Sequence, residues 1–122
     1  MRDPESVVRD FCAAWSRRDV GELLGYFTAD AVYHNIPVEP VTGTDGIREL
    51  LNMFAPAAST AEFEILHLAS RGNVVFAERV DRFTMNGKPV VVPVTGVFEI
   101  RDGKIAAWRD YFDFATWQRQ VT

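Results

Sequence analysis

Three short polar clusters contain the residues of this chain that are able to do acid–base chemistry, and each lies in a segment that alternates like a β-strand. They are Tyr33-His34-Asn35, Glu78-Arg79-Val80-Asp81 and Trp108-Arg109-Asp110-Tyr111. Strands that only build a core do not point carboxylates and a guanidinium inward, because burying an unpaired charge costs free energy. The clusters therefore predict side chains that line a cavity.

The alternation of side chains along a strand indicates which polar groups share that cavity. One consistent arrangement puts five polar side chains on the concave face of a curved sheet, with aromatic rings around them. The five are Tyr33, Asn35, Arg79, Asp81 and Asp110, and the rings are those of Phe83, Trp108 and Phe112. For the apolar wall the alternation leaves two sets open, Val90, Val92 and Val94, or Val91, Pro93 and Thr95.

These residue types fit one kind of chemistry. Two carboxylates in one dry pocket do not both ionise easily, so one takes a raised pKa and acts as a general acid while the other acts as a general base. An arginine between them holds both through its planar fork. A tyrosine hydroxyl and an asparagine amide together donate and accept hydrogen bonds, which fixes a water. The set suits the addition of water to a strained, uncharged substrate.

Each piece also has a structural interpretation. An Arg-x-Asp pair on a strand is more often a cross-strand ion pair, and a tyrosine near a sheet edge is more often a packed ring with a hydrated hydroxyl. The functional interpretation rests on all five side chains sharing one inferred face, each flanked by apolar neighbours.

Composition limits the class of protein. A chain of 122 residues with 48% hydrophobic residues is long enough for one domain, residues 1–122, with a real core. A net charge of −4 argues against a nucleic-acid surface and against binding to an anionic membrane. Cys12 alone forms no internal disulfide, and the polar N-terminus lacks an apolar signal core. We therefore expect a cytoplasmic protein.

Helical periodicity dominates the first half of the chain. The pattern predicts a helix around Val8–Trp15 that starts near Asp3-Pro4, and a second at Val20–Phe27 capped by Asp19 and ended by residues 28–30. A third helix follows Gly43, with Thr44 as its cap and Pro56 as its end.

Alternation with a period near two marks the strands. They are expected at residues 31–36, 63–69, 74–84, 90–100 and 105–112, with hairpin turns at Asn86-Gly87 and Asp102-Gly103 and a short closing helix over residues 113–121. Helices followed by a four-strand meander, which the first strand joins, give an α+β class. A strongly curved sheet wrapped around the N-terminal helices leaves a cone whose open end suits a deep small-molecule pocket.

At this level of detail the chain resembles the limonene-1,2-epoxide hydrolases, within the wider NTF2-like, SnoaL-like or cystatin-like cone fold. The stretches that carry the resemblance are residues 27–37, Glu78-Arg79-Val80-Asp81, Gly96-Val97-Phe98 and residues 103–113. The motifs most specific to this family are Tyr-His-Asn, Glu-Arg-Val-Asp and Trp-Arg-Asp-Tyr-Phe-Asp.

The resemblance implies a role for each polar residue. Asp110 matches the aspartate that takes a proton from water, and Tyr33 and Asn35 match the residues that hold this water. Asp81 matches the acid that protonates the epoxide oxygen, and Arg79 matches the bridge between the aspartates. The implied reaction is a single step without a covalent intermediate, a metal or a cofactor, in a protein that is typically a homodimer.

The expected substrate is a small, largely apolar epoxide, cyclic or terpenoid-like, which water converts to a vicinal diol. The residues expected to line its pocket are Phe54, Phe83, Val92, Val94, Trp108, Phe112 and Trp117. Cys12 and Trp15 lie on the first helix, near positions where family members often carry pocket residues.

Two other functions fit the same fold. A ketosteroid-isomerase-like or polyketide-cyclase-like enzyme would shuttle a proton on an unsaturated ketone, but an arginine that bridges the carboxylates suits the hydrolase better. A non-catalytic small-ligand-binding module would show binding without chemistry. A metal cluster is not expected, because the chain has only His34, His67 and one cysteine.

Overall fold

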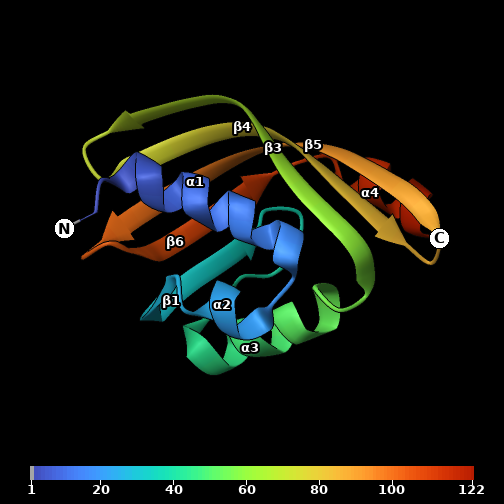
Figure 1. Ribbon diagram of the computed structural model, residues 1–122, viewed down its shortest axis with the longest axis horizontal. Helices are drawn as coiled ribbons and strands as arrows, with labels where there is room; N and C mark the ends of the chain where they lie inside the picture. Colours follow the sequence, from blue (N-terminus) through green and yellow to red (C-terminus); the bar gives the residue numbers. More distant parts are fainter. Residues whose placement is uncertain (1) are drawn as a thin grey trace.

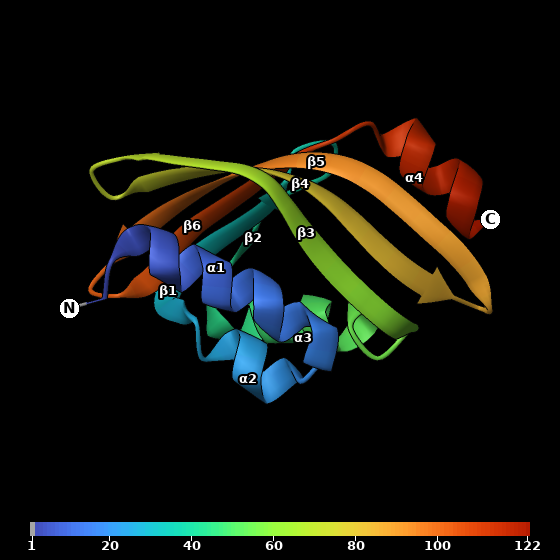
Figure 2. The same cartoon turned by 45° about the horizontal axis from the view of Figure 1, so that its top comes forward.

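A six-stranded sheet curls around the N-terminal helices of the protein (Figures 1 and 2). The structure is a computed structural model that describes residues 2–122. The strands are β1 (Phe27–Asn35), β2 (Val41–Thr42), β3 (Ala58–Arg71), β4 (Val74–Met85), β5 (Lys88–Arg101) and β6 (Lys104–Tyr111), and the helices are α1 (Pro4–Ala14), α2 (Val20–Leu24), α3 (Gly43–Phe54) and α4 (Phe114–Val121). A 3₁₀ turn, η1 (Trp15–Arg17), follows α1. The α+β prediction is confirmed.

The sheet is mixed, with the strand order β2-β1-β6-β5-β4-β3. Strands β3 to β6 form the predicted antiparallel meander, whereas β1 joins β6 in parallel. Figure 2 shows the sheet arching over α1, with α2 and α3 below it and α4 at one end of β5. Among residues 2–122, no helix is both long enough and apolar enough to cross a bilayer.

Aspartates begin three of the helices. The side chains of Asp3, Asp19 and Asp113 each accept a hydrogen bond from a backbone N–H in the first turn, as expected for N-caps. The predicted cap of α3 is wrong. The helix begins at Gly43, and Thr42 occupies its N-cap without a side-chain hydrogen bond. Gly43 has a φ of +84°, a value that glycine adopts without steric cost.

The second predicted helix is too long. It ends at Leu24, and Phe27 begins β1, which also contains Thr28–Asp30, the residues predicted to end the helix. Phe27 is buried as the first residue of the strand, as is also expected at the end of the helix. Its ring packs against that of Phe11 at a centroid distance of 5.4 Å. Burial at a helical spacing therefore could not separate the end of a helix from the start of a strand.

Two predicted hairpin turns connect the long strands. Asn86 and Gly87 have φ values of 54° and 75°, and Asp102 and Gly103 have values of 53° and 75°. Two consecutive left-handed residues make the turn that matches the twist of antiparallel strands. These turns fix the register of β4 on β5 and of β5 on β6, and with it the placement of the polar clusters.

The concave face of the sheet is the inner face. On β4 the buried positions alternate as predicted from Val75 to Phe83. On β5 the buried set is Val90, Val92 and Val94, and not the alternative set that begins at Val91. Side chains of α1, among them Phe11, pack under this face. The molecule thus encloses its polar cluster between the sheet and the helices.

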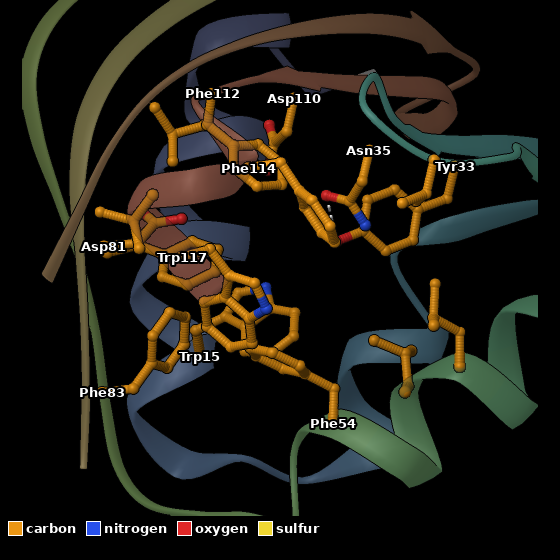
Figure 3. A pocket seen from close by; sticks show the side chains of 16 residues that line it. Trp15, Tyr33, Asn35, Phe54, Asp81, Phe83, Asp110, Phe112, Phe114 and Trp117 are labelled. Carbon is orange, nitrogen blue, oxygen red and sulfur yellow. Dashed lines mark hydrogen bonds between the residues drawn. The ribbon is translucent and has the colours of Figure 1, made fainter. Parts of the chain in front are cut away.

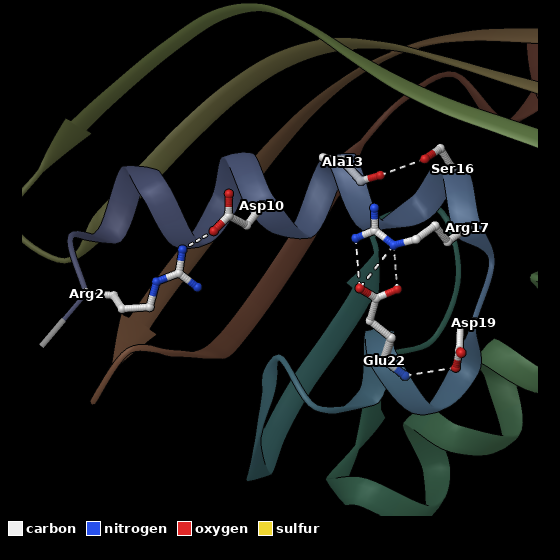
Figure 4. A network of polar contacts seen from close by, with 7 residues as sticks. All are labelled: Arg2, Asp10, Ala13, Ser16, Arg17, Asp19 and Glu22. Atoms are coloured by element: carbon white, nitrogen blue, oxygen red, sulfur yellow. Dashed lines mark hydrogen bonds and ion pairs between the residues drawn. The ribbon is translucent and has the colours of Figure 1, made fainter.

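Exposed ion pairs lie on the outer side of the N-terminal helices (Figure 4). Arg2 pairs with Asp10, and Arg17 donates to both carboxylate oxygens of Glu22, the shortest bond measuring 2.7 Å. Such solvated pairs add little to stability and lie away from the cavity.

Candidate active site

One cavity of about 170 Å³ opens between the concave face of the sheet and the helices (Figure 3). Its polar lining groups are Tyr33, Asn35, Asp81 and Asp110, together with the indole of Trp15, and the rest of its wall is aliphatic or aromatic. The other lining residues are Val38, Leu50, Leu51, Phe54, Phe63, Phe83, Val92, Val94, Phe112, Phe114 and Trp117. The cavity is therefore an apolar cup with a few convergent polar groups, the form expected of a small-molecule site.

Arg79 joins the two aspartates of this cup. Its Nε and Nη2 donate to Asp81 Oδ1 and Oδ2 at 3.0 and 2.8 Å, and its Nη1 and Nη2 donate to Asp110 Oδ1 and Oδ2 at 3.0 and 2.8 Å. The three residues are 1–4% exposed. A bidentate pair of bonds to each carboxylate engages all three guanidinium nitrogens and four of the five N–H donors. The structure thus brings together the acidic pair and the arginine that the strand alternation placed on one face.

Gly96 on β5 makes this bridge possible. It lies between Ala77 of β4 and Asp110 of β6, so the arginine must cross over it to reach Asp110. A Cβ at position 96 would lie 2.5 Å from Arg79 Nη1 and 2.7 Å from Asp110 Oδ1. The Gly96-Val97-Phe98 stretch carried part of the family resemblance, but sequence reasoning gave this glycine no role in the site.

Tyr33 and Asn35 reach the site from β1. The parallel register pairs Tyr33 with Trp108 and Asn35 with Asp110, so the amide lies one strand away from the carboxylate. The Tyr33 hydroxyl donates to Asn35 Oδ1 at 3.4 Å, and both side chains line the cavity. Figure 3 shows the two residues side by side at the edge of the cavity next to Asp110.

Trp108 does not line the cavity, contrary to its predicted place in the substrate pocket. Its side chain is fully buried beneath Tyr33, on which it stacks at 4.1 Å with an angle of 3° between the rings. Its Nε1 donates to Asp110 Oδ1 at 2.6 Å. Strand alternation put Trp108 on the correct face, but it could not show that Tyr33 covers the ring.

Burial sets the ionisation of the polar cluster. It raises the pKa of Asp81 from 3.8 to about 6, against the opposing pull of Arg79. Burial also raises the pKa of the Tyr33 hydroxyl, and the charge of Asp110 acts in the same direction, so Tyr33 remains a hydrogen-bond donor. Burial alone would lower the pKa of Arg79, but the charges of Asp110 and Asp81 outweigh it and hold this pKa well above its usual value.

The two aspartates differ in the number of hydrogen bonds that their carboxylates accept. Asp110 receives three N–H bonds, two from Arg79 and one from Trp108, whereas Asp81 receives two from Arg79. Each donor stabilises a carboxylate over a carboxylic acid. Asp110 thus has one hydrogen-bond donor more than Asp81, and Asp81, with its pKa raised to about 6, carries a proton at mildly acidic pH.

The apolar lining agrees with most of the predicted substrate residues. Phe54, Phe83, Val92, Val94, Phe112 and Trp117 all line the cavity. Trp15 lines it as well, but Cys12 does not, and burial raises the pKa of its thiol to about 12. Sequence reasoning missed five lining residues, Val38, Leu50, Leu51, Phe63 and Phe114. Phe63 shares a strand face with Ala61 and Ile65, a pattern that a ring in the core would also show. Phe114 follows the last predicted strand, where alternation no longer indicates which way a side chain points.

Among residues 2–122, no group of three or more His, Cys, Asp or Glu side chains is arranged to hold a metal ion. The chemistry available to the cavity from these side chains is proton transfer between the carboxylates, the tyrosine hydroxyl, the amide and a small molecule bound beside them.

A curled mixed sheet around helices, with its polar residues in the hollow, defines the cone fold of SnoaL-like and NTF2-like proteins. A putative SnoaL-like polyketide cyclase from Shewanella putrefaciens superposes with a TM-score of 0.86 over 99% of this chain and 97% of its own, at 16% identity. At that identity the likeness concerns the fold alone.

The chain belongs to the limonene-1,2-epoxide hydrolase family, whose catalytic domain matches residues 2–122. It is 31% identical over 107 residues to the epoxide hydrolase EphG of Mycobacterium tuberculosis, a match that covers 88% of this chain and 71% of that protein. The structure of an LEH-like epoxide hydrolase from M. tuberculosis superposes with a TM-score of 0.85 and 28% identity, covering 97% of this chain and 88% of the other. The predicted family is confirmed.

Proposed function

We propose that the protein is a cofactor-independent epoxide hydrolase that adds water to a small, largely apolar epoxide and releases a vicinal diol. The observation that carries this proposal is the buried Asp81–Arg79–Asp110 bridge at an apolar cavity. Membership of the family and the likeness to EphG support the same reaction.

In the proposed step, Tyr33 and Asn35 hold a water beside Asp110. Asp110 takes one proton from this water as its oxygen attacks an epoxide carbon, and the carbon–oxygen bond of the ring breaks. Asp81 gives its proton to the departing oxygen, which becomes the second hydroxyl of the diol. The proton gained by Asp110 and the one lost by Asp81 balance, and exchange with solvent restores both residues.

Arg79 serves both carboxylates in this scheme. Its positive charge offsets the single negative charge that the pair carries before and after the transfer, so the buried cluster stays neutral overall. The raised pKa of Asp81 keeps a fraction of this residue protonated near neutral pH, which a general acid requires.

Direct attack by water can be tested with isotope-labelled solvent. In a single turnover in ¹⁸O-water, the label is expected in the diol and not in the protein, because no carboxylate forms an ester with the substrate. Asp81→Asn and Asp110→Asn are each expected to lower kcat sharply for a panel of cyclic epoxides followed by chiral product analysis. Unchanged rates in either variant would remove the proposed role.

A proton shuttle on an unsaturated ketone is the main competing activity. It needs one base and a donor to the enolate oxygen, and it gives no role to an arginine bound to both carboxylates through four hydrogen bonds. Isomerisation of such a ketone by a protein that leaves every epoxide intact would replace the hydrolase proposal.

We also propose that the protein forms a homodimer through the convex face of the sheet. Leu66, Phe76, Val91 and Tyr111 are apolar or aromatic side chains that are 42–48% exposed. Their strands, β3, β4, β5 and β6, are neighbours in the sheet. Light scattering is expected to show a dimer for the purified parent protein and a monomer for Phe76→Glu. A monomeric parent protein would contradict this assignment.

A further inference from the structure

Trp15 is the one lining residue whose side chain carries a buried hydrogen-bond donor without an acceptor. Its indole is 2% exposed and stacks on Phe63 at 4.7 Å with an angle of 14° between the rings. Phe54 meets its edge at 6.0 Å. Figure 3 shows Trp15 on the wall shared with Phe54, Phe83 and Trp117.

No acceptor for Trp15 Nε1 exists among residues 2–122. The other fully buried tryptophan, Trp108, donates to Asp110, which is the usual behaviour of an indole in a core. A buried donor without an acceptor costs roughly 1–3 kcal/mol. Because Trp15 lines the cavity, a bound molecule that reaches the indole nitrogen can supply the missing acceptor.

The remaining groups of the cavity limit the kind of acceptor. The charge of Arg79 is paired with two carboxylates, and no cationic side chain lines the cavity to receive an anionic ligand. Both carboxylates line the same cavity. An indole only donates a hydrogen bond. The matching ligand group is a neutral oxygen, such as that of a ketone, ester, ether or alcohol.

We infer that Trp15 is a specificity-determining residue that selects epoxides carrying a second, neutral oxygen group remote from the ring. This inference rests on the proposed function and narrows it. The preferred substrates are oxygenated epoxides, such as epoxy ketones, rather than epoxides of pure hydrocarbons. A site with a buried donor discriminates against the analogue that lacks the acceptor, because the donor is then left unpaired.

A pair of unreactive ligands tests the binding step separately from catalysis. They are 1-methyl-4-acetylcyclohexene and 1-methyl-4-isopropenylcyclohexene, which have nearly the same shape and differ by a carbonyl oxygen in place of a methylene group. The chain has three tryptophans, so ¹⁵N-labelled protein shows three indole resonances, and Trp15→Phe assigns one of them. The acetyl compound is expected to shift the Trp15 resonance downfield and to bind roughly tenfold more tightly than the isopropenyl compound.

The 1,2-epoxides of the same two compounds test turnover. The parent protein is expected to show a kcat/KM roughly tenfold higher for the acetyl epoxide, the factor expected for one hydrogen bond. Trp15→Phe is expected to abolish this preference, because phenylalanine keeps the stack on Phe63 and removes the donor. Trp117→Phe, a matched change on the same wall, is expected to alter both epoxides alike.

The outcomes separate the two proposals. Equal affinity for the two cyclohexenes, without a shift of the Trp15 resonance, would overturn the role of Trp15 even if both epoxides are hydrolysed. A selective shift and tighter binding of the acetyl compound would support that role even if neither epoxide reacts, in which case the hydrolase proposal fails alone. Loss of the preference in Trp117→Phe but not in Trp15→Phe would assign the donor to Trp117 and contradict the inference.

Discussion

Trp108 and Asp110, two positions apart on β6, are joined by a 2.6 Å hydrogen bond from the indole Nε1 to the carboxylate Oδ1. Two rings clamp this indole, Tyr33 at 4.1 Å and Phe98 at 5.6 Å, with interplanar angles of 3° and 14°. A donor held on both sides by rings cannot turn away from its acceptor. Trp108 therefore fixes the orientation of Asp110 relative to Arg79.

Replacing Trp108 with phenylalanine is expected to lower kcat/KM for epoxides by roughly tenfold to a hundredfold, the range for one hydrogen bond to a charged group. Phenylalanine keeps a ring between Tyr33 and Phe98 but removes the donor. Phe98→Leu is the matched control, because it trims the packing around the indole and leaves the donor in place. An equal loss of rate in both variants would assign the effect to packing instead.

The raised pKa of Asp81 predicts the pH dependence of the reaction. A general acid must be protonated, so kcat/KM is expected to fall tenfold per pH unit above a pKa near 6. The alkaline limb should be absent from the residual activity of Asp81→Asn. A pH–rate profile that stays flat from pH 5 to pH 8 would contradict the assignment of Asp81 as the acid.

The same pKa predicts how stability depends on pH. The pKa of Asp81 is higher in the folded protein, about 6, than its ordinary value of 3.8, so folding favours the protonated form. The resulting stabilisation is fully present below pH 3.8 and is lost as pH rises through 6, a change of roughly 3 kcal/mol. Asp81→Asn cannot ionise and is expected to remove this component from the free energy of unfolding.

Urea unfolding at pH 5 and pH 8 provides the measurement. The free-energy difference between the Asn variant and the parent protein should shift in favour of the variant at the higher pH. Glu99→Gln, a change in a surface pair with Arg109 outside the cavity, is the control and should not produce that shift. A variant that gains nothing between the two pH values would show that Asp81 titrates normally.

Gly96 is expected to tolerate no side chain. In Gly96→Ala the new Cβ would meet Arg79 Nη1 at 2.5 Å and Asp110 Oδ1 at 2.7 Å, so the bridge must open on the side of Asp110. Opening it leaves buried charges imperfectly paired, and we expect activity to fall at least a hundredfold and the free energy of unfolding to fall by about 3 kcal/mol.

The control for this change is Gly21→Ala in helix α2. The Cβ at position 21 has only ordinary contact, with Asp19 Oδ1 at 3.4 Å, and alanine favours a helix over glycine. Thermal unfolding and epoxide turnover of the two variants should therefore diverge. Full activity in Gly96→Ala would show that Arg79 does not need its present path across β5.

Local signals in the sequence predict the parts of the fold that depend on neighbouring residues. Asp3 and Asp19 cap their helices, and Asn86-Gly87 makes its turn, because each interaction closes within a few residues. The meander and the face of β4 follow from alternation. The site residues on β4 and β6 could therefore be placed before the structure was known.

Long-range register is what the sequence leaves open. The parallel pairing of β1 with β6 places Asn35 beside Asp110, and no local pattern specifies that register. The same pairing covers Trp108 with Tyr33, which turns a predicted pocket residue into a support for Asp110. The role of Gly96 also depends on the path of Arg79 over a neighbouring strand, which no residue near position 96 reveals.

Gln120 fastens α4, the helix that carries Trp117, to an edge of the sheet. Its Oε1 accepts from the backbone N–H of Val91 at 2.8 Å, and its Nε2 donates to the Val91 carbonyl at 2.8 Å. β5 pairs with β6 only from Thr95 onward, so on that side Val91 would otherwise leave both backbone groups to solvent. The side chain thus extends the ladder and holds one wall of the cavity in place.

Replacing Gln120 with alanine is expected to raise KM for epoxides several-fold with little change in kcat, because α4 helps to enclose the substrate but holds no reacting group. Two hydrogen bonds near the surface contribute about 1–2 kcal/mol, which sets that size. Gln118→Ala, an exposed position on the same helix, is the control. Hydrogen exchange at the Val91 amide should quicken only in the Gln120 variant. If exchange quickens while KM stays constant, the position of α4 does not govern substrate binding.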